Sequence, residues 1–265
     1  LGIKDMAELL KPYAASKLIK ALKQEISIPI HLHTHDTSGN GVATLLMAAE
    51  AGVDIVDTAF NAMAGLTSQP ALNSVVAALE NTEYDTGIDL LNIQKISDYW
   101  TDVRKVYETY ESGLKSGTAE IYRYEIPGGQ YSNLRPQVES FGMGHLFNEI
   151  KETYRDVNGL LGDIVKVTPS SKVVGDLAIF MVKNELTKEN ILEKGKNLTF
   201  PDSVISYFKG MMGQPVGGFP EELQGIVLKG EEPITCRPGE ILEPADFDEI
   251  GKKLKEEFNM DANMR

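Results

Sequence analysis

The sequence predicts an α/β protein whose first third forms a parallel sheet and whose remainder is helical. From residue 1 to about residue 60, short apolar segments alternate with helical patterns, which is typical of parallel strands joined by helices. Beyond about residue 88 the patterns are helical only. A parallel sheet of this kind can be open or closed into a barrel, and the alternation alone does not distinguish the two.

The first elements follow one another at short intervals. Residues 1–6 are predicted to form the end of a strand, and Pro12 stands where the first turn of a helix tolerates a proline. Apolar residues then recur at helical spacing. A second strand is predicted over residues 28–32, a helix rich in small residues over 42–51, and a third strand over 53–59.

The rest of the chain is predicted to consist of helices separated by joints rich in glycine and proline. The helices are expected at residues 93–110, 146–161, 173–182, 203–212 and 247–258. The joints are expected at residues 127–129, 214–218 and 237–239. We therefore divide the chain into a sheet-containing part, residues 1–88, and a helical part, residues 89–265.

His33 and His35 are the most informative residues, because they lie two positions apart at the end of a predicted strand. Side chains at this spacing point to the same face, so two imidazoles here can share one metal ion. His31 has the same parity but lies earlier, and we expect it to be a hydrogen-bonded core residue. Lys4 also falls late in its strand, where a barrel gathers its reactive groups, and Asp5 should point to the opposite side.

Thr168 precedes a predicted helix in the sequence VTPSSK, residues 167–172. A threonine followed by a proline is typical of a helix N-cap and the first helical position, so the residues alone predict a capping threonine. A helix N-terminus also presents free N–H groups to an anion. A functional role is therefore compatible with the capping role.

Composition excludes several classes of function. A net charge of −13 disfavours binding to nucleic acid, because phosphate contacts need basic residues. The single cysteine, Cys236, excludes an internal disulfide and suits a reducing compartment. No apolar run reaches membrane-spanning length and no signal peptide is recognised, so neither a membrane nor nucleic acid is an expected partner.

Five blocks of the sequence resemble the carboxyltransferase domain of pyruvate carboxylases. They are IKDMAELLKP at 3–12, HLHTHDTSGN at 31–40, LTSQP at 66–70, EIPGGQYSNL at 125–134 and VTPSSKVVGD at 167–176. The resemblance runs over essentially the whole chain. Oxaloacetate decarboxylase alpha subunits and transcarboxylases share the lysine and the His-x-His element, but the second and fourth blocks together resemble pyruvate carboxylase more than either.

The resemblance implies that residues 1–88 form the last three strand–helix units of a TIM (β/α)8-type barrel. Residues 89–265 would form a helical cap, shaped as a funnel over the barrel mouth. The first five strands would lie outside this sequence, together with a metal-binding aspartate and a pyruvate-clamping arginine. We therefore expect a piece of a longer protein, and three strands alone would leave sheet edges open to association.

The resemblance also implies an activity and its residues. A biotin-dependent carboxylase, which is a ligase, would transfer the carboxyl group of carboxybiotin to pyruvate and give oxaloacetate. The family's lysine matching Lys4 adds carbon dioxide to become a carbamate, which needs a neutral amine and hence burial. With His33 and His35 it would bind a divalent metal, zinc or alternatively manganese or cobalt. The threonine matching Thr168 carries a proton between pyruvate and biotin, and Ser171 and Lys172 match residues near the biotin ureido group.

The implied partners are pyruvate, a biotin carboxyl carrier domain, a biotin carboxylase domain and further copies of the chain in a tetramer. The expected location is the cytoplasm, or the mitochondrial matrix in a eukaryote. Three alternatives stay open: an oxaloacetate decarboxylase or transcarboxylase-type subunit, a metal-dependent lyase on the same type of barrel, and an inactive assembly piece.

Overall fold

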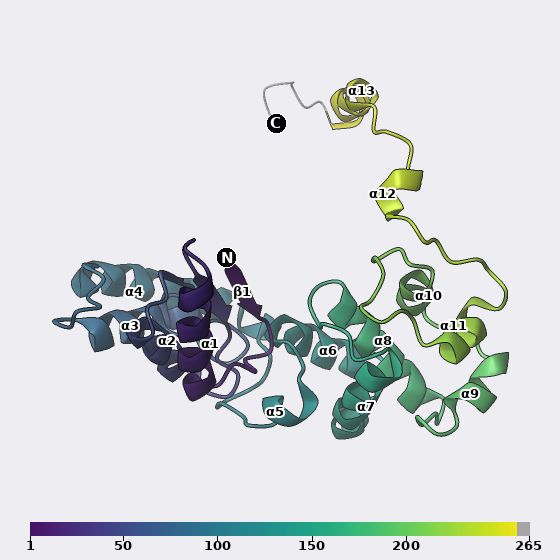
Figure 1. Ribbon diagram of the computed structural model, residues 1–265, viewed down its shortest axis with the longest axis horizontal. Coiled ribbons are helices and arrows are strands. Elements are labelled where there is room, and N and C mark those ends of the chain that lie inside the picture. Colours follow the sequence, from purple (N-terminus) through teal and green to yellow (C-terminus); the bar gives the residue numbers. More distant parts are fainter. Residues whose placement is uncertain (259–265) are drawn as a thin grey trace.

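The computed structural model describes residues 1–258 and is mainly helical, with one small sheet. Figure 1 shows the sheet with helices α1 to α4 on one side of the molecule and helices α6 to α11 on the other, with α5 between them. Helices α12 and α13 extend away from both groups. None of the described helices is both long enough and apolar enough to cross a membrane.

The described residues form one sheet of three parallel strands in the order β1, β2, β3. The strands are β1 (Gly2–Asp5), β2 (His31–Thr34) and β3 (Ile55–Val56). Lys4 lies beside His33 in the pairing of β1 with β2, and His31 lies beside Ile55 in the pairing of β2 with β3. The predicted parallel sheet is therefore confirmed, although β3 is shorter than the predicted strand.

Helices cover one face of this sheet. They are α1 (Pro12–Glu25), α2 (Gly41–Glu50) and α3 (Leu72–Leu79). The elements η1 (Asn61–Met63), α4 (Leu90–Val106) and η2 (Glu108–Tyr110) pack further out, with α4 against α3, η1 and η2. Leu32 of the sheet packs with Ile19 of α1 and Leu45 of α2 in a buried cluster. On the opposite face Lys4 and Ile55 remain exposed among the described residues.

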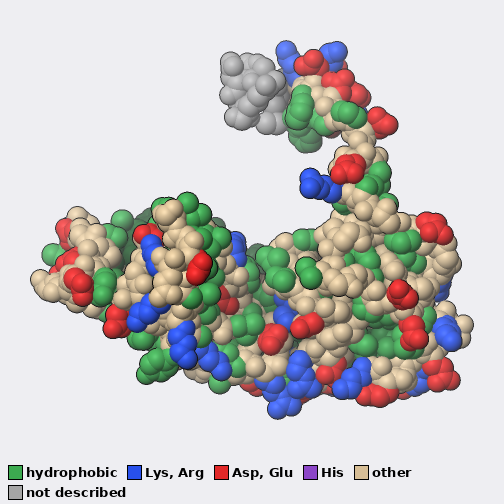
Figure 2. Space-filling view, viewed as in Figure 1, with side chains coloured by type: hydrophobic (Ala, Val, Ile, Leu, Met, Phe, Trp, Pro, Cys, Tyr) green, Lys and Arg blue, Asp and Glu red, His purple; other side chains and the backbone are tan. Residues whose placement is uncertain are grey.

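The helical part has its own core around α8. Its elements are α5 (Ile121–Tyr124), α6 (Gly128–Ser140), η3 (Gly144–Leu146), α7 (Phe147–Leu160), α8 (Ser170–Lys183), α9 (Ile191–Lys194), η4 (Gly195–Asn197), α10 (Asp202–Phe208), α11 (Glu221–Leu228), α12 (Pro238–Ile241) and α13 (Phe247–Phe258). Helix α8 packs against α6, α7 and α10, and most of its residues are buried. Figure 2 shows hydrophobic side chains on the surface of α13, where Phe247, Ile250, Leu254 and Phe258 are exposed.

Helix α6 corrects the prediction of a joint at residues 127–129. Gly128 opens the helix, and its N–H donates to the carbonyl of Met6 over 3.1 Å. A Cβ on Gly128 would lie 2.4 Å from the carbonyl oxygen of Thr67 and 2.6 Å from Nδ1 of His35. Glycine is needed here because the helix begins in direct contact with the loops that follow the strands.

The change from the first buried core to the second falls later in the chain than the predicted boundary after residue 88. Helix α4 packs against α3 and η1, and the second buried cluster begins at Ile126. By packing, the division therefore lies between α4 and α5. The functional division of the chain at residue 88 stays a prediction.

Candidate metal centre and adjoining cavity

The imidazoles of His33 and His35 lie side by side at the carboxyl end of β2. Their ring centroids are 5.4 Å apart and the rings meet edge to face, with an interplanar angle of 81°. Lys4 is the neighbour of His33 on β1. His35 is 5% exposed. The structure thus brings the two histidines together and places Lys4 on the adjacent strand.

Both rings are held through their Nδ1 atoms. Nδ1 of His33 lies 2.7 Å from Oδ2 of Asp57, and Nδ1 of His35 lies 2.7 Å from the carbonyl oxygen of Thr67. Carboxylate and carbonyl oxygens accept hydrogen bonds, so each Nδ1 donates and each Nε2 keeps a free lone pair. Metal-binding histidines typically use their second nitrogen in this way.

Nε2 of His35 is buried and has no hydrogen-bond partner within residues 1–258. A buried polar atom without a partner is uncommon, and a bound cation would satisfy this lone pair. Burial lowers the pKa of the His35 imidazole, although the bond to Thr67 opposes the shift. Neutral imidazole is the form that binds metals, so the donor atoms fit a divalent ion.

The two imidazoles would form only part of a complete ligand set. No three His, Cys, Asp or Glu side chains meet as metal ligands in the part of the chain that the structure describes. Lys4 is exposed, whereas the carbamate expected there needs a buried lysine. The physical reason is that Lys4 lies on the sheet face that the helices leave open.

Asp5 faces away from Lys4, as the alternation of a strand predicts. Its carboxylate accepts hydrogen bonds from the hydroxyl of Thr34 and from the N–H groups of Leu9 and Leu10. Asp5 therefore orders the turn that leads from β1 into α1, and it takes no part in the candidate metal centre.

His31 is hydrogen-bonded, as expected, but the expectation that it lies in the core is wrong. Its Nε2 lies 2.6 Å from Oδ1 of Asp57, and its side chain is 42% exposed, against 19% for His33. The face that carries these histidines is the open one, so burial does not increase toward the start of β2.

Asp57 is the residue that the sequence prediction missed. It directly follows β3 and has the same parity as Ile55, so it lies on the face that carries His31 and His33. Its position at the end of the predicted strand 53–59, beside the histidine strand, is the signal that identifies it in retrospect.

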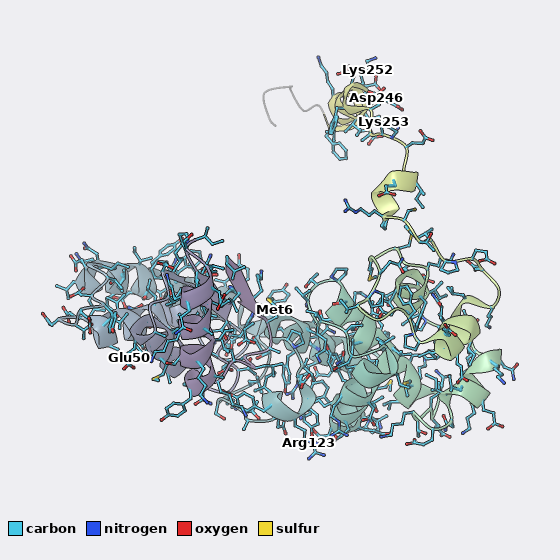
Figure 3. All side chains as sticks on the ribbon, in the orientation of Figure 1. Met6, Glu50, Arg123, Asp246, Lys252 and Lys253 are labelled. Carbon is cyan, nitrogen blue, oxygen red and sulfur yellow. The ribbon has the colours of Figure 1, made fainter. Side chains whose placement is uncertain are left out.

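A cavity of about 610 Å³ is lined by residues of both the sheet-containing part and the helical part. Its walls are formed by Lys4, by the turn after β1, by Glu125 and by residues 163–167. Figure 3 shows Met6, which belongs to this turn, between the two groups of helices. The buried Lys166 Nζ lies 2.7 Å from the carboxylate of Glu125 and ties the segment before Thr168 to the end of α5. Lys4 and the segment leading to Thr168 therefore border one cavity.

The expectation that Thr168 caps the following helix is wrong. Helix α8 begins at Ser170, and Pro169 occupies the capping position without a side-chain bond to the first turn. The N–H groups of Ser171 and Lys172 donate instead to the carbonyls of Val167 and Pro169. Backbone carbonyls therefore accept the hydrogen bonds of these first N–H groups of α8. Thr168 remains exposed.

Ser171 and Lys172 lie apart from the cavity that Lys4 borders. Ser171 is 4% exposed, and its carbonyl accepts a hydrogen bond from the hydroxyl of Tyr154. The Lys172 ammonium pairs with Asp176 one turn later, beside a second cavity of about 380 Å³. The structure does not bring these two side chains to the candidate metal centre.

Comparison with known proteins finds a matching family for each part of the chain. A family described as the conserved carboxylase domain matches residues 121–265, and a family described as HMGL-like matches residues 1–99. Pyruvate carboxylase of Bacillus subtilis is 56% identical over 263 residues, which is 99% of this chain and 23% of that protein. Pyruvate carboxylase of Staphylococcus aureus is 54% identical over 97% of this chain and 22% of its own length. The chain thus spans less than a quarter of these relatives.

Solved structures agree. The carboxyl transferase domain of Rhizobium etli pyruvate carboxylase matches with a TM-score of 0.94 and 49% identity, over 98% of this chain and 44% of that one. The complete multifunctional pyruvate carboxylase of Rhizobium etli matches with a TM-score of 0.94 and 49% identity, over 98% of this chain and 26% of that one. The chain therefore belongs to the conserved carboxylase domain family, and it is similar along nearly its whole length to part of the carboxyl transferase domain of pyruvate carboxylases.

Proposed function

We propose that the chain is part of the carboxyltransferase of a pyruvate carboxylase, which transfers the carboxyl group of carboxybiotin to pyruvate and gives oxaloacetate. The observation that carries this proposal is the pair of imidazoles held through Nδ1, with the buried Nε2 of His35 unpartnered in the described residues. Structures of the similar Rhizobium etli domain with pyruvate and biocytin, and with oxamate and biotin, support the substrate class.

The three strands would be the last three of an eight-stranded barrel completed from outside this sequence. The one-sided helical cover supports this proposal, because open doubly wound sheets carry helices on both faces whereas a barrel carries them only outside. The face with Lys4, His33 and Asp57 would then line the barrel interior. Further strands over this face would also supply the burial that a carbamate on Lys4 needs.

His33, His35 and Lys4 would hold the divalent ion, with zinc the first expectation and manganese or cobalt the alternatives. When bound, the ion would stabilise the negative charge that develops on the pyruvate carbonyl oxygen. Asp57 and the Thr67 carbonyl would orient the two imidazoles, since each holds one Nδ1 atom.

Thr168 would move the proton. Thr168 is exposed and directly follows Val167, which borders the same cavity as Lys4, and this supports a role in taking a proton from the pyruvate methyl group and passing it to biotin. Cleavage of the N–C bond of carboxybiotin would release carbon dioxide and leave the biotin anion that accepts this proton. The enolpyruvate would then form its new carbon–carbon bond with that carbon dioxide. Ser171 and Lys172 stay proposed as biotin-binding residues because they follow Thr168 directly, but their side chains would have to turn toward the cavity.

The proposed partners are the biotin carboxyl carrier and biotin carboxylase domains of the longer protein and further copies in a tetramer. The cytoplasm, or the mitochondrial matrix of a eukaryote, is the proposed location. The relatives described above are pyruvate carboxylases, and no observation favours a decarboxylase, a transcarboxylase or a lyase.

The proposal is tested in the longer protein that carries this chain. The double variant His33→Ala/His35→Ala should lose both bound divalent metal and oxaloacetate formation, while the ATP-dependent carboxylation of biotin continues. The exposed His145 lies on η3 in the helical part, so His145→Ala is the matched control and should change neither. Undiminished metal content and turnover in the double variant would overturn the proposal.

A further inference from the structure

The carboxylate of Asp57 bridges two histidines of the neighbouring strand. Oδ1 lies 2.6 Å from Nε2 of His31, and Oδ2 lies 2.7 Å from Nδ1 of His33. Both carboxylate oxygens are therefore engaged by imidazoles of β2. The backbone N–H of Asp57 donates to the carbonyl of Leu32 over 3.1 Å, which fixes the residue at the end of β3.

This bridge sets the direction of the His33 ring. A carboxylate accepts hydrogen bonds, so the proton of neutral His33 stays on Nδ1 and the lone pair on Nε2. His31 donates to the other oxygen and limits rotation of the carboxylate. The ring of His33 can therefore present only Nε2 to a ligand, on the side where His35 lies 5.4 Å away between ring centroids.

We propose that Asp57 is a positioning residue for the metal centre, fixing the tautomer and the orientation of His33, with His31 as the anchor of its second oxygen. The inference rests on the proposed function, because it assumes that His33 binds the ion. It gives His31 a role, which is to hold the second carboxylate oxygen of Asp57. It also explains why three histidines occur in one short strand segment although only two are expected to be ligands.

A second aspartate of the same segment provides a matched control. Asp54 lies just before β3, and its carboxylate bonds to Lys23 over 2.5 Å and to the N–H of Ile30 over 2.7 Å. Within the described residues the Asp54 carboxylate makes no hydrogen bond or ion pair with a histidine. Replacing Asp54 removes the same charge from the other end of β3 and takes no hydrogen bond from His31 or His33.

The dissociation constant of Zn²⁺ is measured in the longer protein by competition with a chromophoric chelator. Asp57→Ala should weaken Zn²⁺ binding about 10- to 100-fold, the usual effect of removing such a partner of a metal ligand. Asp57→Asn should restore part of the affinity, because an asparagine has one accepting oxygen in place of two. Asp54→Ala should leave the constant within about twofold, since ligands and their partners are untouched.

A double-mutant cycle of Asp57 and His33 distinguishes positioning of His33 by Asp57 from a general structural role of Asp57. In the His33→Ala background, Asp57→Ala should have no further effect on Zn²⁺ binding, because Asp57 acts through His33. Equal weakening in both backgrounds would overturn the inference. If Asp57→Ala fails to fold, His31→Ala takes its place and should weaken binding a few-fold; no change would overturn the inference.

The inference and the proposed function fail in different ways. Wild-type affinity in Asp57→Ala combined with weak binding in His33→Ala overturns the role of Asp57 and leaves the metal centre in place. Wild-type affinity in His33→Ala overturns the metal centre itself, and the role of Asp57 falls with it.

Discussion

Thr168 can be tested as a proton carrier without interference from helix capping. The first N–H groups of α8 bond to the carbonyls of Val167 and Pro169, so removal of the Thr168 hydroxyl takes no bond from the helix. The stability loss expected of a capping threonine should therefore be absent. A substitution at Thr168 can therefore change catalysis without changing the stability of α8.

We predict that Thr168→Ala lowers oxaloacetate formation by about a hundred- to ten-thousand-fold, the usual contribution of a positioned proton-transfer group. Thr168→Ser keeps a hydroxyl and should remain partly active. Both variants should unfold at the parental temperature, and the biotin carboxylase half-reaction is the internal control. Near-parental pyruvate carboxylation by the alanine variant would show that the hydroxyl has no role in proton transfer.

Single residues were predictable where strand parity decides their position. His33, His35, Lys4 and Asp5 follow from alternation along a strand. The exposure of His31 and Lys4 did not follow, because it depends on which face of the sheet the helices cover. Asp57 was missed because its contacts join two strands that are separated by a helix in the sequence.

At the scale of elements, Glu8 connects the turn after β1 with two other parts of the chain. Its buried carboxylate accepts hydrogen bonds from the N–H and the hydroxyl of Ser38 and from the N–H of Asn40. The Ser38 hydroxyl in turn lies 2.9 Å from the hydroxyl of Tyr122 on α5. Glu8 thus orders the loop that follows His35 and links it to the helical part.

This carboxyl predicts a pH dependence of the loop. Burial raises the pKa of Glu8 above its ordinary value of 4.5, although the bonds from Ser38 oppose the shift. The folded loop therefore holds this proton more tightly than the opened loop. The contribution of Glu8 to stability is greatest below pH 4.5 and falls as pH rises through the interval up to the raised pKa.

Hydrogen exchange of the peptide spanning residues 36–42, corrected for intrinsic rates, measures this dependence. Glu8→Gln should weaken the pH dependence in this interval, leaving the part due to Asp36, whose pKa burial also raises. It should also ease opening by about 1–3 kcal/mol, because an amide N–H then meets backbone donors. The exposed Glu80 provides the control Glu80→Gln. An unchanged pH profile in Glu8→Gln would show that another group titrates.

Helices were predictable where apolar periodicity was continuous. Helix α13 (Phe247–Phe258) matches its predicted range in full, while α10 ends at Phe208, short of the predicted 212, because Gly210 follows with a φ of +83°. Helices α3, α6 and α11 and the single-turn helices α5, α9 and α12 were missed, and α12 begins within the predicted joint 237–239. In α6 two opening glycines and the internal Pro136 hide the pattern, and contact with the sheet loops stabilises the helix in spite of them.

At the scale of the whole molecule, the sequence predicted parallel strands and a helical part but could not show which face of the sheet stays uncovered. The two buried clusters and the one-sided cover of the sheet are tertiary features, produced by contacts between distant segments. The strands β1 and β3 are edges of the sheet in the described residues. Exposed edges with apolar side chains favour association between chains.

We predict that the chain of 265 residues, prepared on its own, associates with itself as its concentration rises. Ile55 on the edge strand β3 is 49% exposed, and Ile28 before β2 is 54% exposed but lies outside the sheet edges. Ile55→Lys should reduce association in sedimentation velocity, because a lysine at an edge opposes strand pairing, whereas Ile28→Lys should not. Either change lowers the net negative charge of −13 and so weakens general repulsion between chains. A selective effect of Ile55→Lys therefore identifies the edge, and equal effects of both variants would attribute the association to hydrophobic surface in general.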